Sequence, residues 1–213
     1  MKLSKESLKK LYLELDQSMR DAFDRSLPFD EYLYDRFERA VDINAGKDSS
    51  VHHSCYIYGK PRIGQNTWVG PFTILDASGG LTIGDNCSIS AAVHIYTHDT
   101  VDKRISNGKM PGEKGSVIIG HSCYIGPHSI IGKDVVLGDF CVVGANSFVA
   151  KSFPSNSVVV GTPARLKGKI KFDTQGKPSI EWLDENNSNE KKIQSLEKII
   201  LKLESRIEKL EKT

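Results

Sequence analysis

The sequence predicts a mainly β protein built as a parallel β-helix, and three observations support this. Aliphatic residues recur at every sixth position, a glycine follows most of them directly, and a small side chain recurs four positions after them. Neither a helix nor an alternating strand repeats at six, whereas one face of a triangular coil of about eighteen residues does. Stacked coils would then bury a continuous aliphatic column. The aliphatic series is Val51, Ile57, Ile63, Val69 and Leu75, then Ile83, Ile89 and Ile95, then Ile119, Ile125, Ile131, Leu137, Val143 and Val149.

Residues 1–50 are expected to form an N-terminal helical region. Apolar side chains spaced by three or four form one stripe, until Leu27-Pro28 breaks the pattern, and a second short helix is expected to begin at Glu31. Such a region could cap the open first coil, whose backbone edge would otherwise favour aggregation. The stripe comprises Leu8, Leu11, Leu15, Met19 and Phe23.

The β-helix is expected to span residues 51–168, with a polar, glycine-containing loop at 97–116. A loop of this length inside a compact repeat is usually functional. Glycines at the repeat positions fit tight corners where a Cβ would crowd the chain, and we expect this of Gly64, Gly70, Gly84, Gly120, Gly126, Gly132, Gly138 and Gly144. The small-residue positions are Cys55, Thr67, Thr73, Cys87, Cys123, Ser129, Cys141 and Ser147.

Residues 169–189 are expected to be an exit segment and linker, and residues 190–213 a coiled-coil helix. Apolar residues there alternate spacings of three and four, which is typical of a heptad seam. The alternatives are a single helix packed on its own domain and a helix that recruits another protein. The seam comprises Ile193, Leu196, Ile200, Leu203, Ile207 and Leu210.

The bulk composition excludes several classes of protein. A charged fraction of 26% and a formal net charge of +2 in 213 residues give no argument for nucleic-acid binding. No apolar run approaches the roughly 20 residues that span a bilayer, and the N-terminus lacks a secretory h-region, so a cytoplasmic protein is expected. The four cysteines form no CxxC pair, and their repeat positions favour packing over disulfides or zinc.

Two further motifs carry a resemblance to a known family. Tyr96-Thr97-His98-Asp99 opens the loop, and Val160-Gly161-Thr162-Pro163-Ala164-Arg165 closes the repeat. Together with the six-residue repeat, they resemble the left-handed β-helix acetyltransferases over about residues 51–168. Within that family the sequence is most similar to the sugar O-acetyltransferases, which include the maltose and galactoside acetyltransferases. The resemblance implies acetyl-CoA as co-substrate, and direct transfer in a ternary complex.

The resemblance implies that His98 is the general base, because imidazole can take and return a proton near pH 7. It also places Asp76 near the acceptor, although an Asx-turn at Asp76 is an equal alternative. The asparagine expected one coil earlier has no clear match, and Trp68 falls nearby instead. His94 is a further candidate for facing the acceptor. The metal-binding histidine spacing of the γ-class carbonic anhydrases, which share this fold, is not found, so no metal is expected.

On the cofactor side, the resemblance implies small residues that flank the pantetheine arm, an aromatic residue that packs against CoA, and basic residues near its phosphates. It also implies a homotrimer with active sites between neighbouring copies. The matching positions are Ser90, Tyr124, Pro127, Ala145, Ala150, Lys151 and Arg165.

Three functions remain open at this point. The first is an acetyl-CoA-dependent O-acetyltransferase acting on a sugar hydroxyl in polysaccharide or glycoconjugate synthesis. The second is an N-acetyltransferase acting on an amino sugar or a nucleotide-linked amino sugar. The third is a non-catalytic trimeric scaffold whose coiled coil binds a protein partner.

Overall fold

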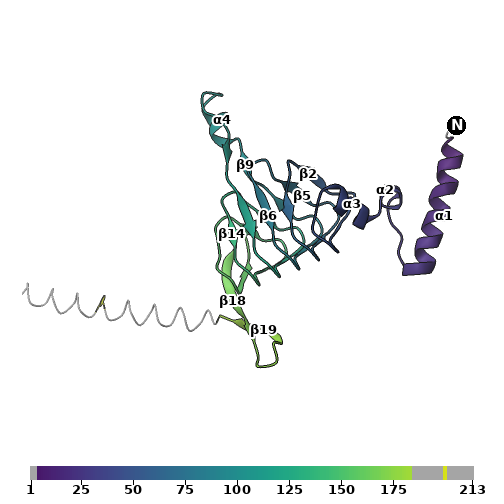
Figure 1. Cartoon of the computed structure of the whole chain (residues 1–213). Helices are drawn as coiled ribbons and strands as arrows, with labels where there is room; N and C mark the ends of the chain where they lie inside the picture. Colours follow the sequence, from purple (N-terminus) through teal and green to yellow (C-terminus); the bar gives the residue numbers. More distant parts are fainter. Residues whose placement is uncertain (1–3, 184–198, 201–213) are drawn as a thin grey trace, which may run out of the picture.

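The computed structural model describes residues 4–183 together with 199 and 200. The chain folds into a three-sided parallel β-helix, with helices at one end and a hairpin at the other (Figure 1). Within the described residues, the eight-stranded sheet runs in the order β1 (Ser50–Val51), β4 (Trp68–Val69), β7 (Ser88–Ile89), β12 (Tyr124–Ile125), β15 (Val142–Val143), β17 (Ser157–Val160), β18 (Arg165–Phe172) and β19 (Pro178–Trp182).

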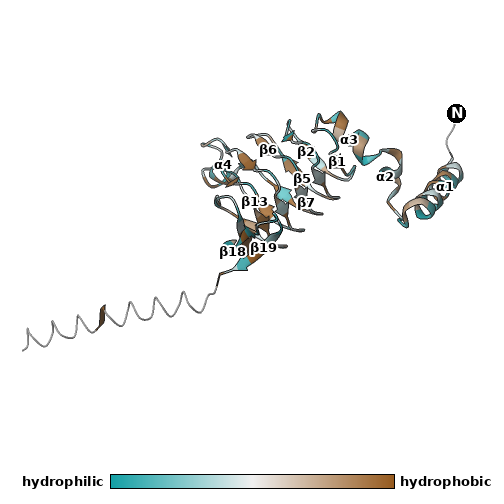
Figure 2. Cartoon of the chain, turned by 60° about the horizontal axis from the view of Figure 1, so that its bottom comes forward, coloured by the Kyte–Doolittle hydropathy of each residue, from teal (hydrophilic) through white to brown (hydrophobic). Residues whose placement is uncertain are grey.

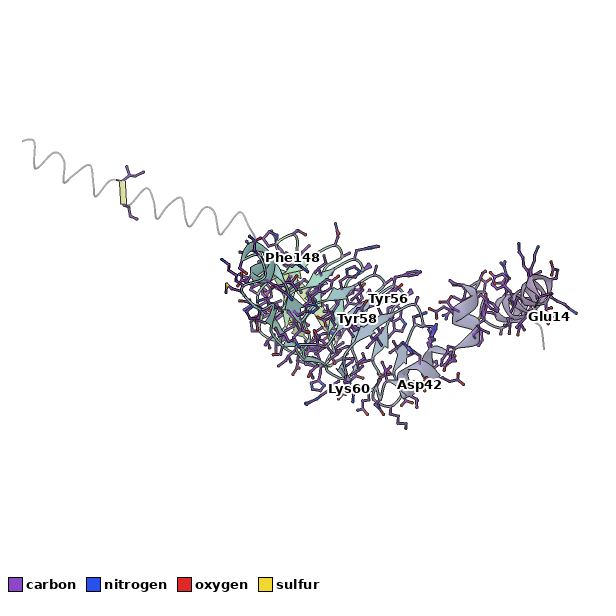
Figure 3. All side chains as sticks on the ribbon, turned by 90° about the horizontal axis from the view of Figure 1, so that it is seen from above. Glu14, Asp42, Tyr56, Tyr58, Lys60 and Phe148 are labelled. Carbon is purple, nitrogen blue, oxygen red and sulfur yellow. The ribbon has the colours of Figure 1, made fainter. Side chains whose placement is uncertain are left out.

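The other two sides of the β-helix are smaller sheets. One is five-stranded, in the order β16 (Phe148–Val149), β13 (Ile130–Ile131), β8 (His94–Ile95), β5 (Ile74–Asp76) and β2 (Tyr56–Tyr58). The other is four-stranded, in the order β14 (Val136–Leu137), β11 (Val117–Ile119), β6 (Leu81–Ile83) and β3 (Arg62–Ile63). Figure 3 shows Phe148 and Tyr56 well apart along the five-stranded side, with Tyr56 nearer to α3.

Three edges join the three sheets of the prism. Edge 1 joins the eight-stranded sheet to the five-stranded sheet, edge 2 joins the five-stranded to the four-stranded sheet, and edge 3 joins the four-stranded sheet to the eight-stranded sheet of the next coil. The corners stack from coil to coil: along edge 1, Ala92 N donates to Pro71 O at 2.9 Å and Asn146 N donates to Pro127 O at 2.9 Å. Residues on one edge therefore share one side of the prism.

The predicted aliphatic column forms the core. Val51, Leu75 and Ile125 have no exposed surface, and the other members are nearly as buried. Ile57 is the exception, because it lies on β2, the last strand of its sheet, where no further coil covers it. Stacking in register buries each aliphatic residue on the one in the next coil, which is the main favourable contribution to folding.

The small-residue positions are buried as well, and most of their side chains donate hydrogen bonds to the next coil. Thr67 Oγ1 donates to Gly84 O at 2.9 Å, Ser129 Oγ to Gly144 O at 3.0 Å, and Cys123 Sγ to Gly138 O at 3.2 Å. All four cysteines are buried free thiols. The position thus selects a small side chain that is also a hydrogen-bond donor, which serine, threonine and cysteine share.

The repeat glycines let neighbouring coils approach each other. A Cβ on Gly84 would lie 2.7 Å from the carbonyl carbon of Gly120 in the next coil, which is too close. The left-handed backbone that turns the corners falls instead on later residues, such as Asn66, Asn86 and Asn146. Asparagine tolerates this conformation better than most residues.

The N-terminal region contains α1 (Lys5–Phe23), α2 (Phe29–Leu33) and α3 (Arg36–Asp42). Ala40 of α3 is buried in the core beside β1, so α3 covers the end of the first coil. Helix α1 stands away from the β-helix (Figure 1), and Figure 2 shows hydrophobic and hydrophilic colours on its different sides. Among the described helices, none is long and apolar enough to cross a membrane.

The loop and the C-terminal part complete the chain. The loop contains β9 (His98–Asp99), α4 (Val101–Ile105) and β10 (Glu113–Lys114), and it projects from edge 2 (Figure 1). Strands β18 and β19 form an antiparallel hairpin that extends the eight-stranded sheet, where we expected only an exit segment. The predicted coiled coil lies outside the described residues, apart from Ile199 and Ile200.

Replacing Thr67 with Val should destabilise the protein by about 2–3 kcal/mol. The new side chain has the same shape, but it removes the bond to Gly84 O and the 3.1 Å bond that Thr67 Oγ1 accepts from Cys87 N. Urea unfolding at fixed protein concentration measures the change. The Thr67→Ser variant keeps both bonds and should lose less, so equal losses in the two variants would contradict this explanation.

Candidate active site

The candidate site lies on edge 2, where the loop leaves the β-helix. Strand β8 ends at the buried Ile95, Thr97 is fully buried, and His98 begins the loop. His98 and Lys114 face each other across the antiparallel pair of β9 and β10, which forms the base of the loop. His98, at the start of the loop, is therefore held by regular backbone pairing.

His98 contacts a buried carboxylate of the preceding coil. Its Nδ1 lies 2.6 Å from Asp76 Oδ2, and 3.1 Å from the hydroxyl oxygen of Ser78. The Asp76 side chain is 2% exposed, whereas the His98 side chain is 45% exposed. The pair thus has a buried acidic member and an accessible imidazole.

Backbone and side-chain donors hold the Asp76 carboxylate. Thr97 N donates to Oδ2 at 2.9 Å, the Thr97 hydroxyl lies 3.1 Å from the same oxygen, and Ser78 N donates to Oδ1 at 3.0 Å. Burial alone would raise the pKa of Asp76, but the hydrogen bonds from Ser78, His98 and Thr97 outweigh burial and hold that pKa well below its usual range. The carboxylate is therefore ionised at neutral pH.

An ionised carboxylate can only accept hydrogen bonds, so His98 Nδ1 carries a proton toward Asp76. In the neutral ring the unprotonated nitrogen is then Nε2, whose lone pair is available to an incoming molecule. We expected Asp76 either to help hold the acceptor or to form an Asx-turn. Its carboxylate accepts from the Ser78 amide, as an Asx-turn requires, and it also contacts His98, an arrangement that fixes the tautomer of an imidazole.

The other predicted site residues lie in three places. Ala150 and Lys151 are on edge 2, on the same side of the prism as His98, and His94 faces outward from the five-stranded sheet. The remaining predicted residues lie on edge 1 or on the eight-stranded sheet beside it, and they are Trp68, Ser90, Tyr124, Pro127, Ala145 and Arg165. A single copy therefore does not bring the predicted cofactor residues together around His98.

The side chains of Lys151, Arg165 and His94 each make one identified contact in the structure. The Lys151 ammonium lies 5.5 Å from the centroid of the Phe153 ring, and Arg165 donates to the Ala164 carbonyl at 3.1 Å. Both cations are exposed and available to an anion. His94 Nδ1 lies 3.3 Å from the Tyr96 hydroxyl. In the part of the chain that the structure describes, no three His, Cys, Asp or Glu side chains are grouped to hold a metal ion.

Residues 116–151 match the family described as bacterial transferase hexapeptide (six repeats). A hexapeptide-repeat-containing acetyltransferase from Vibrio cholerae is similar in structure, with 27% identity, a TM-score of 0.56, and coverage of 76% of this chain and 89% of that chain. The chain carries this hexapeptide repeat and shares the fold of these acetyltransferases. The predicted fold and enzyme class are thereby confirmed.

Two further solved structures resemble this chain. An N-acyltransferase from Bacillus cereus, in complex with dTDP-4-amino-4,6-dideoxyglucose and coenzyme A, is 26% identical, with a TM-score of 0.52 and coverage of 74% and 78% of the two chains. A galactoside acetyltransferase in complex with coenzyme A is 24% identical, with a TM-score of 0.57 and coverage of 79% and 84%. The galactoside enzyme shows the shared fold only.

Two residues of the site were missed from the sequence. Thr97 and Ser78 both contact the Asp76–His98 pair, yet they belong to an ordinary loop opening and to an ordinary turn sequence. The signal for Ser78 was the turn sequence after Asp76, because the amide two residues after an aspartate closes an Asx-turn, as the Ser78 amide does here. Nothing in the six-residue repeat marked Thr97 as a ligand of the carboxylate.

The lowered pKa of Asp76 predicts a pH-dependent contribution to stability. A depressed carboxyl pKa stabilises the fold above the unfolded pKa near 3.9, and this contribution is lost as the pH falls toward the folded value. At pH 7, Asp76→Asn should therefore lower the free energy of unfolding by about 2–3 kcal/mol. Denaturant unfolding at several pH values tests this. The difference from wild type should narrow below about pH 4, and a gap that stays constant with pH would contradict it.

Proposed function

We propose that the enzyme transfers an acetyl group from acetyl-CoA to a sugar hydroxyl, in polysaccharide or glycoconjugate synthesis, with His98 as the general base. The observation that carries this proposal is the short contact between His98 and the buried Asp76, which leaves Nε2 unprotonated on an exposed edge. The N-acyltransferase of this fold that was solved in complex with coenzyme A supports the use of a CoA thioester.

The arrangement suits direct transfer. His98 Nε2 takes the proton of the acceptor hydroxyl as its oxygen attacks the thioester carbonyl, and it returns that proton to the sulfur of the departing CoA. Asp76 stabilises the imidazolium formed between the two steps, and it holds the ring in one orientation. No covalent enzyme intermediate is needed, because both substrates are bound together.

The same proposal includes a homotrimer in which each active site lies between two copies. Edge 2 supplies His98, Asp76, Ala150 and Lys151, whereas the other predicted cofactor residues belong to edge 1. Because edges 1 and 2 lie at opposite margins of the five-stranded sheet, a second copy would supply edge 1 beside the first copy's His98. Lys151 and Arg165 would then bind the phosphates of CoA.

Transfer to the nitrogen of an amino sugar, free or nucleotide-linked, is the second candidate. The observation that favours it is the similarity to the N-acyltransferase in complex with a dTDP-linked amino sugar. An amine is a better nucleophile than a hydroxyl once it is deprotonated, and the same histidine would serve it. A non-catalytic scaffold would retain the prism but would have no use for an ionised carboxylate under an exposed imidazole.

Replacing His98 with Gln should reduce acceptor-dependent release of CoA by about a thousandfold while leaving CoA binding intact. The assay uses purified protein, acetyl-CoA and a panel of free sugars, amino sugars, nucleotide sugars and oligosaccharides, with calorimetry for CoA. The active acceptor decides between oxygen and nitrogen.

The matched control is His121→Gln. His121 Nδ1 lies 3.3 Å from Asp85 in a second His–Asp pair, on edge 3 and away from the loop. It should keep wild-type activity. Full activity in the His98 variant would show that His98 is not the general base. Failure of the wild-type protein to bind CoA would favour the scaffold.

A mixing experiment tests whether the site is shared between copies. Ala145→Trp should block edge 1, because Ala145 is exposed there, and His98→Ala removes the base on edge 2. Each variant alone should be inactive. Co-expressed oligomers should regain about a quarter of wild-type activity, since random assembly leaves that share of sites with two intact edges. No recovery would place the whole site within one copy.

A further inference from the structure

Lys133 lies on edge 2, in the coil that follows the one from which the loop departs. It follows Gly132 at the end of β13, and the pairing of Ile131 with Ile95 brings it alongside the residues that open the loop. Its ammonium is 3.5 Å from Asp99 Oδ2 and 3.9 Å from Asp134 Oδ2, and it forms an ion pair with Glu113. One cation thus contacts three carboxylates.

Two of these carboxylates belong to the two strands of the loop base. Asp99 and Glu113 are register partners across β9 and β10, so Lys133 joins the outgoing strand to the returning strand. Asp99 also directly follows His98 in the chain. The returning strand is held further by Gly115 N, which donates to Thr97 O at 2.9 Å. The base of the loop is therefore tied to the coil that follows it, as well as to Asp76 in the coil before.

Lys133 is also the cation that balances the charge at this point. Removing it would leave Asp99, Glu113 and Asp134 without that partner. Two other charged groups face His98 itself, namely Asp76 at Nδ1 and Lys114 across the β9–β10 pair. The carboxylates raise the pKa of Lys133, Glu113 most of all, so that it stays protonated over the working range of pH.

Two simpler roles fit these contacts less well. A lysine that binds a phosphate of CoA should have its ammonium available, as Lys151 does, but that of Lys133 already lies within 4 Å of three carboxylates. A purely stabilising role is weak, because exposed ion pairs contribute about 0–1 kcal/mol. The Lys133 side chain is 23% exposed and its partners are more exposed still.

We propose that Lys133 is a positioning residue for acetyl transfer, holding the two strands of the loop base so that His98 stays seated against Asp76. This inference rests on the proposed role of His98 as the base. It assigns no contact between Lys133 and either substrate. The expected consequence of losing Lys133 is a slower transfer step with both substrates still bound.

The test compares Lys133→Met, which removes the charge, with Lys133→Arg, which keeps it. We expect Lys133→Met to lower kcat by about tenfold, with the KM for acetyl-CoA and for the acceptor within about twofold of wild type. The acid limb of the pH profile of kcat/KM should shift to higher pH by about half a unit. The three carboxylates that lose the Lys133 cation would favour the protonated imidazole. Lys133→Arg should recover most of the activity.

A control and a rescue accompany this pair. Lys47→Met removes a single exposed ion pair, with Asp48 at 3.9 Å, in the corner before the first coil, and it should change neither activity nor the pH profile. Adding Asp99→Asn to Lys133→Met removes one unbalanced carboxylate and should return the acid limb toward wild type. Melting temperatures should move by only a few degrees in all variants.

An NMR titration of His98 in protein with 13C-labelled histidine keeps the test independent of turnover. The pKa of His98 should be about half a unit higher in Lys133→Met than in wild type. Unchanged kcat and unchanged His98 titration would overturn the proposal, as would equal losses in the Met and Arg variants. If no acceptor is acetylated by wild type, the proposed function fails, and the titration alone decides whether Lys133 controls His98.

Discussion

The register between coils is the constraint on which the rest of this structure depends. Val51 pairs with Val69, eighteen residues later, and Ile125 pairs with Val143 at the same interval, so each aliphatic residue stacks on its counterpart. A shift of one residue would turn every buried side chain outward. Core packing, the donor side chains at the small-residue positions and the close approach at glycines such as Gly84 all follow from keeping that register.

This constraint also decides where function can be placed. Extra residues can enter only at a corner, and only if the chain returns in phase. The slip after Leu75 lengthens one turn, so that Leu75 pairs with Ile95, and the loop lengthens the next, so that Ile95 pairs with Ile131. Both irregularities fall on edge 2 in consecutive coils. Their coincidence brings Asp76, at the slip, against His98, at the loop.

These relations explain what the sequence could and could not predict. Periodicity was enough for the core, because burial of Val69 or Leu137 depends only on phase. Resemblance was enough to single out His98. The contact between Asp76 and His98 depends on how an irregular corner folds, which periodicity does not describe. The hairpin of β18 and β19 was missed because Gly161-Thr162-Pro163 suggested an exit rather than a return, although Lys167, Lys169 and Lys171 alternate with other residues as a strand requires.

The division between a buried Asp76 and an exposed His98 has a physical consequence for the proposed acetyl transfer. Asp76 is fixed by two groups of the protein itself, Thr97 and Ser78. The orientation of the imidazole is therefore set in advance, and no reorganisation of solvent is needed around the carboxylate when the proton moves. His98 itself lies on a loop, where backbone motion would otherwise loosen this geometry. The base of the loop is paired as β9 and β10 and is tied to the next coil by Lys133, so His98 is attached to a regular, anchored part of the loop.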